Sequence, residues 1–385
     1  MKVLVLGAGF AGLAAAFAAR RKGAEVTVVH STPGASALYA GVVDGALAPR
    51  DAAEAGMLAD LCRALGLRQN QKTVIATREG VVRRAHGADA SLLDLAPLAG
   101  KHVGVVDVPR DDWDGPLLAR SFAASDWARS SGTRFELVPL ELLEKSYQRR
   151  VSSFDFAASF ERAERPAWLI ELLKAHAGPA AWLFGPWLGI KRTLALELTT
   201  ALGVPVGEVT SPPGGVAGAR FDDRRLALLR SLEAEVVAAR VTEVRTSASG
   251  VSLSLEGGLE LSGDALVLAS GGFVSGAFGL SGALSGHEPA GFELAIAGLP
   301  AVHVRGELGR PVSSLFAVDL AARGPQLLER VGLPVSPEGR VSGAPRVLAA
   351  GDVTAPAPPS VAHALLGGLR AGTASAGIAR GVPLE

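Results

Sequence analysis

Short apolar runs alternate with glycine-containing breaks over the first thirty residues. Residues 2–6 are mostly apolar, residues 13–22 are rich in alanine, and residues 25–29 are largely apolar again. A short apolar run is typical of a strand buried on both faces, and an alanine-rich run closed by a glycine is typical of a helix. The pattern predicts a strand, a helix that stops at Gly23, and a second strand parallel to the first.

The same reasoning predicts further elements. We expect helices over residues 50–66, 92–98, 167–176, 224–234 and 361–380, and strands over residues 103–108, 135–140, 236–244, 251–255, 259–261, 264–269 and 346–350. The strands at 236–244, 251–255 and 259–261 are predicted to form a small antiparallel meander. The aromatic stretch 182–190 fits a core loop or an exposed patch for a partner or the membrane, and the core is favoured because exposed apolar patches are uncommon.

These elements predict an α/β protein. We expect a Rossmann-like domain with a parallel sheet and a small antiparallel meander, plus an inserted α+β second domain. The first domain is expected to hold residues 1–74, 215–274 and 340–385, and the second residues 75–214 and 275–339. A chain of 385 residues with 48% hydrophobic content is large enough for two cores.

Charge and cysteine content narrow the function classes. Lys plus Arg and Asp plus Glu number 38 each, which argues against binding to nucleic acid or to an anionic membrane. The lone Cys62 excludes a disulfide framework, a cysteine-rich zinc site and an iron–sulfur cluster held by this chain alone; no metal site is expected. The N-terminus imitates a secretory signal, but its glycines favour a strand–turn–helix, so we expect a cytoplasmic protein.

A glycine-rich turn carries the first chemical signal. Gly7 permits a tight turn, Gly9 lets a pyrophosphate approach the backbone, and Gly12 lets the helix lie close to the strand. The helix N-terminus offers free N–H groups and the positive end of its dipole to the phosphates. Because the turn follows a strand and opens a helix, it predicts a cofactor site. The predicted contacts are Gly7, Gly9, Phe10, Ala11 and Gly12.

The end of the second strand departs from the usual pattern. A carboxylate at this position normally binds the ribose hydroxyls, but this chain has His30. Histidine can make one such hydrogen bond but cannot accept two. Three interpretations stay open: weakened ribose binding, a ligand without an adenosine half, or a solvent-facing histidine without a role.

Two later turns indicate a flavin rather than a free nicotinamide cofactor. Residues 351–353 end a late strand and lead to the C-terminal helix, and residues 270–272 follow another buried strand. Both resemble turns of two-dinucleotide-fold flavoproteins, in which the aspartate meets the ribityl or phosphate region. The alternative for Asp352 is a helix or turn cap. The predicted cofactor residues here are Gly271, Gly272, Gly351, Asp352 and Val353.

The chain resembles the smaller flavoprotein subunit of anaerobic glycerol-3-phosphate dehydrogenase. Residues 34–44 are similar to that family's Ser-Ala-Leu…Ser-Gly…Asp loop, and residues 212–220 to its Pro-Pro-Ser-Val-Pro-Gly-x-Arg block. Residues 268–273 and 339–351 extend the match, whereas residues 75–180 match poorly. The resemblance adds three residues to the predicted cofactor site: Ser36, Ala37 and Gly41.

The resemblance implies a flavin-dependent oxidoreductase subunit that binds FAD or, as described for the family, FMN. It implies oxidation of glycerol 3-phosphate to dihydroxyacetone phosphate, with electrons passing toward quinone. The implied partners are a larger catalytic flavoprotein subunit and an iron–sulfur membrane-anchoring subunit, which would hold the chain at the inner face of the cell membrane. A stand-alone FAD-dependent oxidoreductase of another substrate class and a non-catalytic scaffold with this fold stay open.

Residues for substrate chemistry are harder to identify. Oxidation of a secondary alcohol needs a base, and a phosphate needs a cationic partner. The candidate bases are His363 and His303, and the candidate cations are Arg220, Arg192, Lys191, Arg305 and Arg310. A capping or packing role is the alternative for the histidines, and a surface or interface role is the alternative for the cations.

Overall fold

The computed structural model describes residues 1–32, 34–143, 145–176, 178–281, 291–299, 332–355 and 360–380. The chain divides into two compact units. Unit 1 comprises Met1–Ser36, Gly45–Leu61 and Arg225–Glu385, and unit 2 comprises Ala37–Asp44 and Cys62–Arg224.

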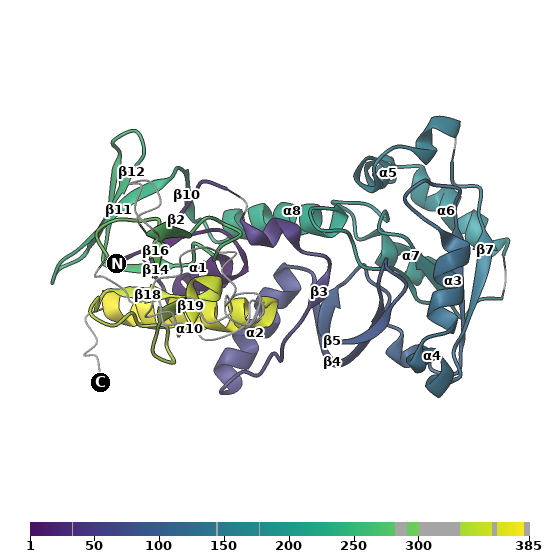
Figure 1. Cartoon of the computed structure of the whole chain (residues 1–385), viewed down its shortest axis with the longest axis horizontal. Helices are drawn as coiled ribbons and strands as arrows, with labels where there is room; N and C mark the ends of the chain where they lie inside the picture. The colour runs from purple at the N-terminus through teal and green to yellow at the C-terminus, as the bar shows by residue number, and fades with distance from the viewer. Residues whose placement is uncertain are drawn as a thin grey trace. The chain divides into compact units, whose positions relative to one another are not determined.

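Unit 1 is built on a five-stranded parallel sheet with the order β10-β2-β1-β14-β18 (Figure 1). Its strands are β1 (Lys2–Leu6), β2 (Glu25–His30), β10 (Glu235–Ala238), β14 (Ala265–Leu268) and β18 (Val347–Ala349). Numbered along the chain, this order is 3-2-1-4-5, as in dinucleotide-binding folds. The predicted Rossmann-like fold is therefore confirmed.

The strands of this sheet are apolar because both of its faces are covered. Successive side chains of β1 point to opposite faces, and Val3 to Leu6 are all buried. Leu4 and Leu6 belong to a core shared with the antiparallel meander. The meander consists of β11 (Val241–Thr246), β12 (Val251–Leu255) and β13 (Glu260–Gly263), and the helices on the sheet are α1 (Phe10–Arg21) and α10 (Val361–Ala379).

Helices α1 and α10 pack closely, because glycines of α10 lie at their contact (Figure 1). A Cβ atom on Gly368 would lie 2.2 Å from the carbonyl oxygen of Ala11, and one on Gly372 would lie 2.2 Å from that of Ala15. Both helices follow strands of one parallel sheet. Their N-termini therefore lie at its carboxyl edge, where ligands of such folds bind.

The units divide the chain differently from the expected domains. The described residues of 275–339 belong to unit 1 rather than to a second domain. The reason is packing, since Phe278, Leu333 and Val341 share a core with the parallel sheet. The remaining elements of unit 1 are η1 (Ala35–Leu38), which reaches into unit 2, β15 (Phe278–Ser281), β16 (Gly291–Leu294), β17 (Leu333–Pro334), η5 (Gly351–Val353) and β19 (Thr354–Ala355).

The expected strand over residues 236–244 is wrong as a single element. Its first part is β10, which pairs in parallel with β2, and only β11 joins the meander. The expected helix over residues 92–98 is also wrong, since only Ala96–Leu98 form a short 3-10 turn, η2. The N–H groups of Leu93 and Leu95 donate instead to the carbonyls of Glu208 and Val74, so strands satisfy this backbone.

Unit 2 contains a second parallel sheet, of order β7-β6-β8-β9, and an antiparallel sheet, of order β3-β5-β4. The strands are β3 (Val42–Val43), β4 (Leu67–Ala76), β5 (Val82–Asp89), β6 (His102–Asp107), β7 (Arg134–Pro139), β8 (Ala181–Phe184) and β9 (Val206–Glu208). The helices are α2 (Ala52–Ala64) and α8 (Val216–Ser231), each of which belongs partly to unit 1, with α3 (Gly115–Ala123), α4 (Asp126–Ser131), η3 (Ser146–Arg149), α5 (Ser153–Ser159), α6 (Arg165–Lys174) and α7 (Leu194–Leu202).

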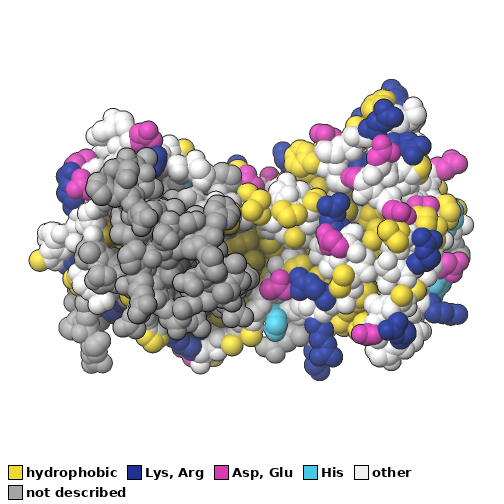
Figure 2. Space-filling model, viewed as in Figure 1, with side chains coloured by type: hydrophobic (Ala, Val, Ile, Leu, Met, Phe, Trp, Pro, Cys, Tyr) yellow, Lys and Arg dark blue, Asp and Glu magenta, His cyan; other side chains and the backbone are white. Residues whose placement is uncertain are grey.

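The aromatic stretch 182–190 lies in the core of unit 2, as the favoured interpretation predicts. Trp182, Phe184 and Trp187 are all buried there. Where Figure 2 shows described residues, acidic and basic side chains are interspersed, which agrees with the neutral composition. Among the described residues, no helix is long and apolar enough to cross a membrane.

Candidate cofactor and substrate site

The glycine turn connects β1 to α1, as predicted. Gly7 has a φ of 111°, and a Cβ atom there would lie 2.1 Å from the carbonyl oxygen of Ala269. A Cβ atom on Gly12 would lie 1.9 Å from the carbonyl oxygen of Gly7. The N-cap of α1 is Gly9, with no side-chain cap and no acidic residue in the first turn. The helix start therefore keeps the positive potential that phosphates need.

Ser36 lies against this turn. Its Oγ accepts a hydrogen bond from the N–H of Phe10 at 3.1 Å, and a Cβ atom on Gly9 would lie 2.6 Å from the same oxygen. His30 ends β2 and is partly buried, and its carbonyl accepts a hydrogen bond from the N–H of Ala239. The segment after β2 is thus held at the start of α1, where the sequence predicts cofactor contacts.

The other two predicted turns meet at the same edge of the sheet. A Cβ atom on Gly272 would lie 3.2 Å from the Cβ of Asp352, and one on Gly351 would lie 2.8 Å from the Cβ of Ala11. Gly351 has a φ of 77°, which favours glycine. Val353 is fully buried in the core, so its backbone is what it can offer a ligand. Three turns that lie far apart in the sequence therefore lie close together at this edge.

A pocket of about 520 Å³ lies beside α10 in unit 1, and we call it the α10 pocket. Its lining comes from segments 45–50, 335–339 and 349–354 and from residues 360–370. It includes Gly351 of the cofactor turn. Its polar lining residues are Arg50, Ser336, Thr354, Ser360, His363 and Arg370.

Carboxylates hold both arginines of the α10 pocket. Arg370 Nε lies 2.6 Å from Glu54 Oε1, and Arg50 Nη1 lies 3.5 Å from Glu338 Oε1. Glu54 is only 7% exposed, and its Oε2 accepts a hydrogen bond from the N–H of Arg50 at 2.5 Å. Arg370 is therefore held by a buried carboxylate and Arg50 pairs with an exposed one, and an anionic ligand would share both cations with these carboxylates.

His363 lies in the first turn of α10, and its N–H donates to Oγ of the N-cap Ser360 at 3.0 Å. Its Nε2 lies 3.1 Å from Thr354 Oγ1. Burial lowers the pKa of His363 below its ordinary value, while the charge of Asp352 acts in the opposite direction. Burial likewise raises the pKa of Asp352, against the effect of His363. The imidazole is therefore neutral near pH 7 and able to accept a proton.

Arg220 forms a buried ion pair in unit 2 rather than facing an open anion site. Its Nη1 lies 2.5 Å from Glu208 Oε2, and its Nε donates to the carbonyl of Gly189 at 2.9 Å. Both charged side chains are 1% exposed. These contacts account for Arg220 as a structural residue, which corrects its assignment as a candidate for phosphate binding.

The other candidate residues fall outside the α10 pocket or outside the described residues. Arg192 pairs with Glu197, and both side chains are well exposed. Lys191 is exposed as well. His303, Arg305 and Arg310 lie outside the described residues.

Ala37 and Gly41 belong to unit 2. A Cβ atom on Gly218 would lie 2.2 Å from the carbonyl oxygen of Ala37, and the rings of Tyr39 and Phe221 meet edge to face at 6.3 Å. The two segments that carry the family resemblance, 34–44 and 212–220, therefore meet at Ala37 and Gly218, and Tyr39 packs on Phe221 directly after the second segment. The proposed contact of Ala37 and Gly41 with a cofactor stays a prediction.

Sequence reasoning missed Glu54, Arg370 and Thr354. One signal was available, because Arg370 is the only Asp, Glu, Lys or Arg in α10. A lone charge in a helix of small and apolar residues indicates a fixed partner. Glu54 and Thr354 have no comparable signal, since Glu54 meets Arg370 from far along the chain and the role of Thr354 depends on the orientation of its side chain.

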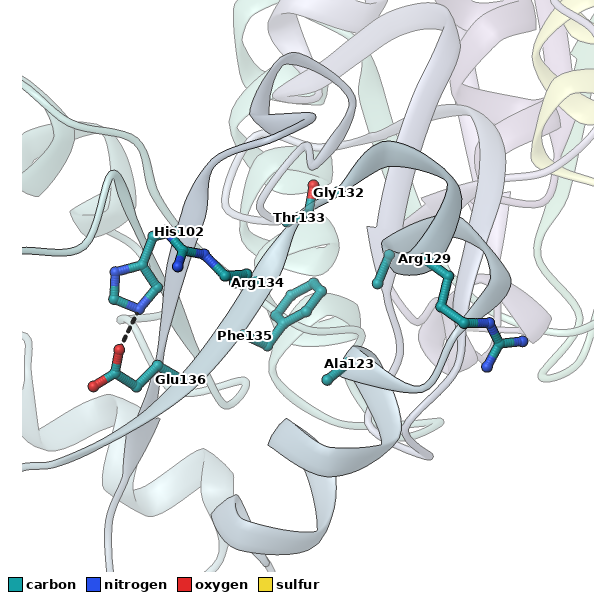
Figure 3. A pocket seen from close by; sticks show the side chains of 9 residues that line it. His102, Ala123, Arg129, Gly132, Thr133, Arg134, Phe135 and Glu136 are labelled. Atoms are coloured by element: carbon teal, nitrogen blue, oxygen red, sulfur yellow. Dashed lines mark ion pairs between the residues drawn. The ribbon is translucent and has the colours of Figure 1, made fainter.

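Unit 2 has a pocket of about 600 Å³ that contains none of the predicted residues (Figure 3). His102 and Arg134, the first residues of β6 and β7, line it. Its charges are largely paired, since His102 Nε2 lies 2.7 Å from Glu136 Oε2 and Arg129 bonds to Asp126. Parallel sheets bind ligands at their carboxyl ends. This pocket lies at the amino ends, so the α10 pocket is the better candidate.

Residues 2–307 match the FAD binding domain family. The chain belongs to this family. Membership places it among FAD-dependent oxidoreductases and makes FAD the cofactor. The glycine turn described above agrees with this cofactor, because Gly7 and Gly12 let the strand and the helix pack closely, as the first and third glycines of dinucleotide-binding turns do. A comparison with curated protein sequences gives no match.

Several solved structures are similar at low identity. AlpK is 15% identical over 95% of this chain and 59% of its own, with a TM-score of 0.34. The open conformation of a flavocytochrome c3 fumarate reductase is 13% identical over 98% of this chain and 78% of its own, with a TM-score of 0.37. Klebsiella pneumoniae HpxO, complexed with FAD and uric acid, is 14% identical over 97% and 78%, with a TM-score of 0.34. Likeness at this level carries no information about substrate, and the chain spans 59% of AlpK.

Proposed function

We propose that this chain is one component of a flavin-dependent dehydrogenase complex and oxidises a secondary alcohol, glycerol 3-phosphate, in the α10 pocket. The observation that carries the proposal is the shared lining of one pocket by His363, Gly351 of the predicted cofactor turn and two arginines. The resemblance of residues 34–44 and 212–220 to the smaller flavoprotein subunit of anaerobic glycerol-3-phosphate dehydrogenase supports the substrate.

The three glycine turns hold FAD in this proposal. The N–H groups at Gly9, Ala11 and Gly12 bind the pyrophosphate at the start of α1, while that of Phe10 donates to Ser36. Asp352 and Gly272, which lie side by side, bind the ribityl region. His30, at the end of β2, makes a single hydrogen bond to the ribose.

When bound, the flavin supplies a two-electron acceptor. Oxidation of the alcohol also releases the proton of its hydroxyl group, and His363 accepts that proton. Arg50 and Arg370 bind the phosphate, and their carboxylate partners keep them oriented. The volume of about 520 Å³ lies within the usual range for small-molecule pockets, roughly 300–1,000 Å³.

The same proposal places the chain in a complex. Cys62 is its lone cysteine, and burial raises the pKa of that thiol, so electrons that leave through an iron–sulfur cluster need another chain. A larger catalytic flavoprotein subunit and an iron–sulfur anchoring subunit fit this need. They would place the chain at the inner face of the cell membrane.

The proposal is tested by following flavin absorbance after the purified chain is mixed anaerobically with glycerol 3-phosphate. We expect bleaching, and we expect His363→Gln to slow it by roughly 10²–10⁴-fold while FAD content is unchanged. Because the pKa of His363 is lowered, the wild-type rate should fall only as the pH drops below about 6.5, where the imidazole gains a proton.

Other outcomes separate the alternatives. Bleaching by a different alcohol or acid, but not by glycerol 3-phosphate, would indicate a stand-alone oxidoreductase of another substrate class. Denaturation that releases no flavin from the purified chain would indicate a scaffold. An equal bleaching rate in wild type and His363→Gln would rule out His363 as the base.

A further inference from the structure

We infer that the hydroxyl of Thr354 holds His363 in the tautomer with a proton on Nε2, which leaves Nδ1 as the proton acceptor of the α10 pocket. Thr354 is then a positioning residue, because it acts on the substrate through His363. The inference about the tautomer rests on geometry, and its catalytic meaning rests on the proposed function.

Two short contacts of the Thr354 hydroxyl carry the argument. Its Oγ1 lies 2.8 Å from the carbonyl oxygen of Gly351 and 3.1 Å from Nε2 of His363. A carbonyl oxygen can only accept, so the single hydroxyl proton points at Gly351. The hydroxyl oxygen has no second proton to offer the imidazole. His363 must therefore donate from Nε2, and Nδ1 carries the free lone pair.

In the opposite tautomer, the lone pairs of His363 Nε2 and Thr354 Oγ1 would face each other. If Nε2 had no proton, Thr354 Oγ1 would face two acceptors with one hydrogen, and one of the two contacts would become repulsive. Thr354 is 6% exposed, so solvent cannot readily compensate for a lost hydrogen bond. The backbone carbonyl of Gly351 cannot turn away easily, because it also accepts a hydrogen bond from the backbone N–H of Thr354.

This arrangement determines where the hydroxyl proton of the alcohol goes. The hydroxyl O–H bond of the alcohol breaks and its proton forms a bond to Nδ1 of His363; the carbon-bound hydrogen and its electron pair would go to the flavin, the two-electron acceptor that the site would hold. The imidazolium that results lies near the carboxyl of Asp352, whose charge favours it, and near Arg370, which opposes it. Glu54 pairs with Arg370 and reduces that opposition. The tautomer is thus set by a carbonyl of the cofactor turn itself.

The direct test is the tautomer of His363 in the full chain with FAD bound. Selective ¹⁵N labelling of the 7 histidines, with long-range ¹H–¹⁵N correlation at pH 8, distinguishes protonated from unprotonated ring nitrogens. His363→Gln identifies the His363 signals by their loss. We expect a protonated Nε2 in the wild-type protein. A protonated Nδ1 would overturn the inference.

Two substitutions at Thr354 make the test specific. Thr354→Val is nearly isosteric but has no hydroxyl, and we expect it to shift His363 toward the Nδ1–H form. Flavin reduction should slow by at least about tenfold, with unchanged FAD content. Thr354→Ser keeps the hydroxyl and should retain both the tautomer and most of the rate. An unchanged tautomer in Thr354→Val would contradict the inference.

The spectrum needs no substrate, which separates this inference from the proposed function. A protonated Nε2 without bleaching by glycerol 3-phosphate would sustain the tautomer and reject the substrate. If Thr354→Val does not fold, the wild-type spectrum and Thr354→Ser still decide the question.

Discussion

Each unit has a parallel sheet whose first strand is followed by a helix, but the two helix starts differ. In unit 1, α1 begins at Gly9 with no side-chain cap and no acidic residue in its first turn. In unit 2, the N-cap of α3 is Asp114, whose Oδ1 accepts a hydrogen bond from the N–H of Leu117 at 2.9 Å. Among the described residues at the start of α1, only the N–H of Phe10 donates to a side chain, the neutral Ser36, so no negative charge opposes a phosphate there; the start of α3 already holds a carboxylate.

The edges of the two sheets also differ in what fills them. At this edge of the sheet in unit 1, a Cβ atom on Gly7 or Gly12 would collide with backbone, so these positions need glycine and carry no side chain. After β6 and β8 of unit 2, the guanidinium of Arg110 stacks 4.5 Å from Phe156 and 5.4 Å from Trp187. The same sheet architecture can thus support a cofactor site or a packed core, and local residues decide which.

The largest effect should follow from closing the glycine turn of unit 1. In Gly12→Ala, the new Cβ would lie 1.9 Å from the carbonyl oxygen of Gly7, so α1 must shift away from the turn. We expect loss of bound FAD, measured by flavin absorbance after denaturation. The control is Gly56→Ala in α2, where nothing lies within 4 Å of the new Cβ. This variant should keep FAD, and its free energy of unfolding should rise by about 0.5–1 kcal/mol. Full FAD occupancy in Gly12→Ala would remove the turn from the cofactor site.

The second effect concerns the core of unit 2. Arg220→Met leaves Glu208 buried without its partner and should cost about 3–5 kcal/mol of unfolding free energy, measured by urea denaturation. The matched control is Arg192→Met, which breaks an exposed pair with Glu197 and should cost at most about 1 kcal/mol. The double variant Arg220→Met with Glu208→Leu should recover most of the loss. Normal stability with weakened substrate binding in Arg220→Met would instead restore Arg220 as a phosphate ligand.

The smallest effect tests the capped helix start of unit 2. Asp114→Ala removes the acceptor for the N–H of Leu117 and should lower the free energy of unfolding by about 0.5–2 kcal/mol. It should also lower the pKa of Asp107, because burial and then the charge of Asp114 raise it. Because the pKa of this carboxyl is raised on folding, the folded protein keeps its proton when the unfolded chain has lost it, and the free energy of unfolding falls as pH rises from about 4 through the raised pKa. The variant should therefore lose part of this pH dependence. Ser125→Ala, at the N-cap of α4, is the control for a lost cap without a lost charge.

Unit 1 was largely predictable because its signals are local. The apolar run of β1, the glycines at 7, 9 and 12 and the alanines of α1 lie within one stretch of chain, and each constrains its neighbours. Residues 236–244 were mispredicted because apolar content cannot tell which of two sheets a strand will join. β10 pairs with β2 in the parallel sheet, whereas β11 pairs with β12 in the meander.

The sequence by itself determined the dinucleotide fold, the three glycine turns and the flavin class, because each depends on backbone shape that only glycine and short spacing allow. Tertiary structure alone decided that Gly272 meets Asp352, that Arg220 is committed to Glu208, and that Thr354 lies between Gly351 and His363. Those outcomes depend on a few ångströms between segments that are distant along the chain or on the orientation of one side chain. Residue order does not encode such distances until the sheet and helices have packed.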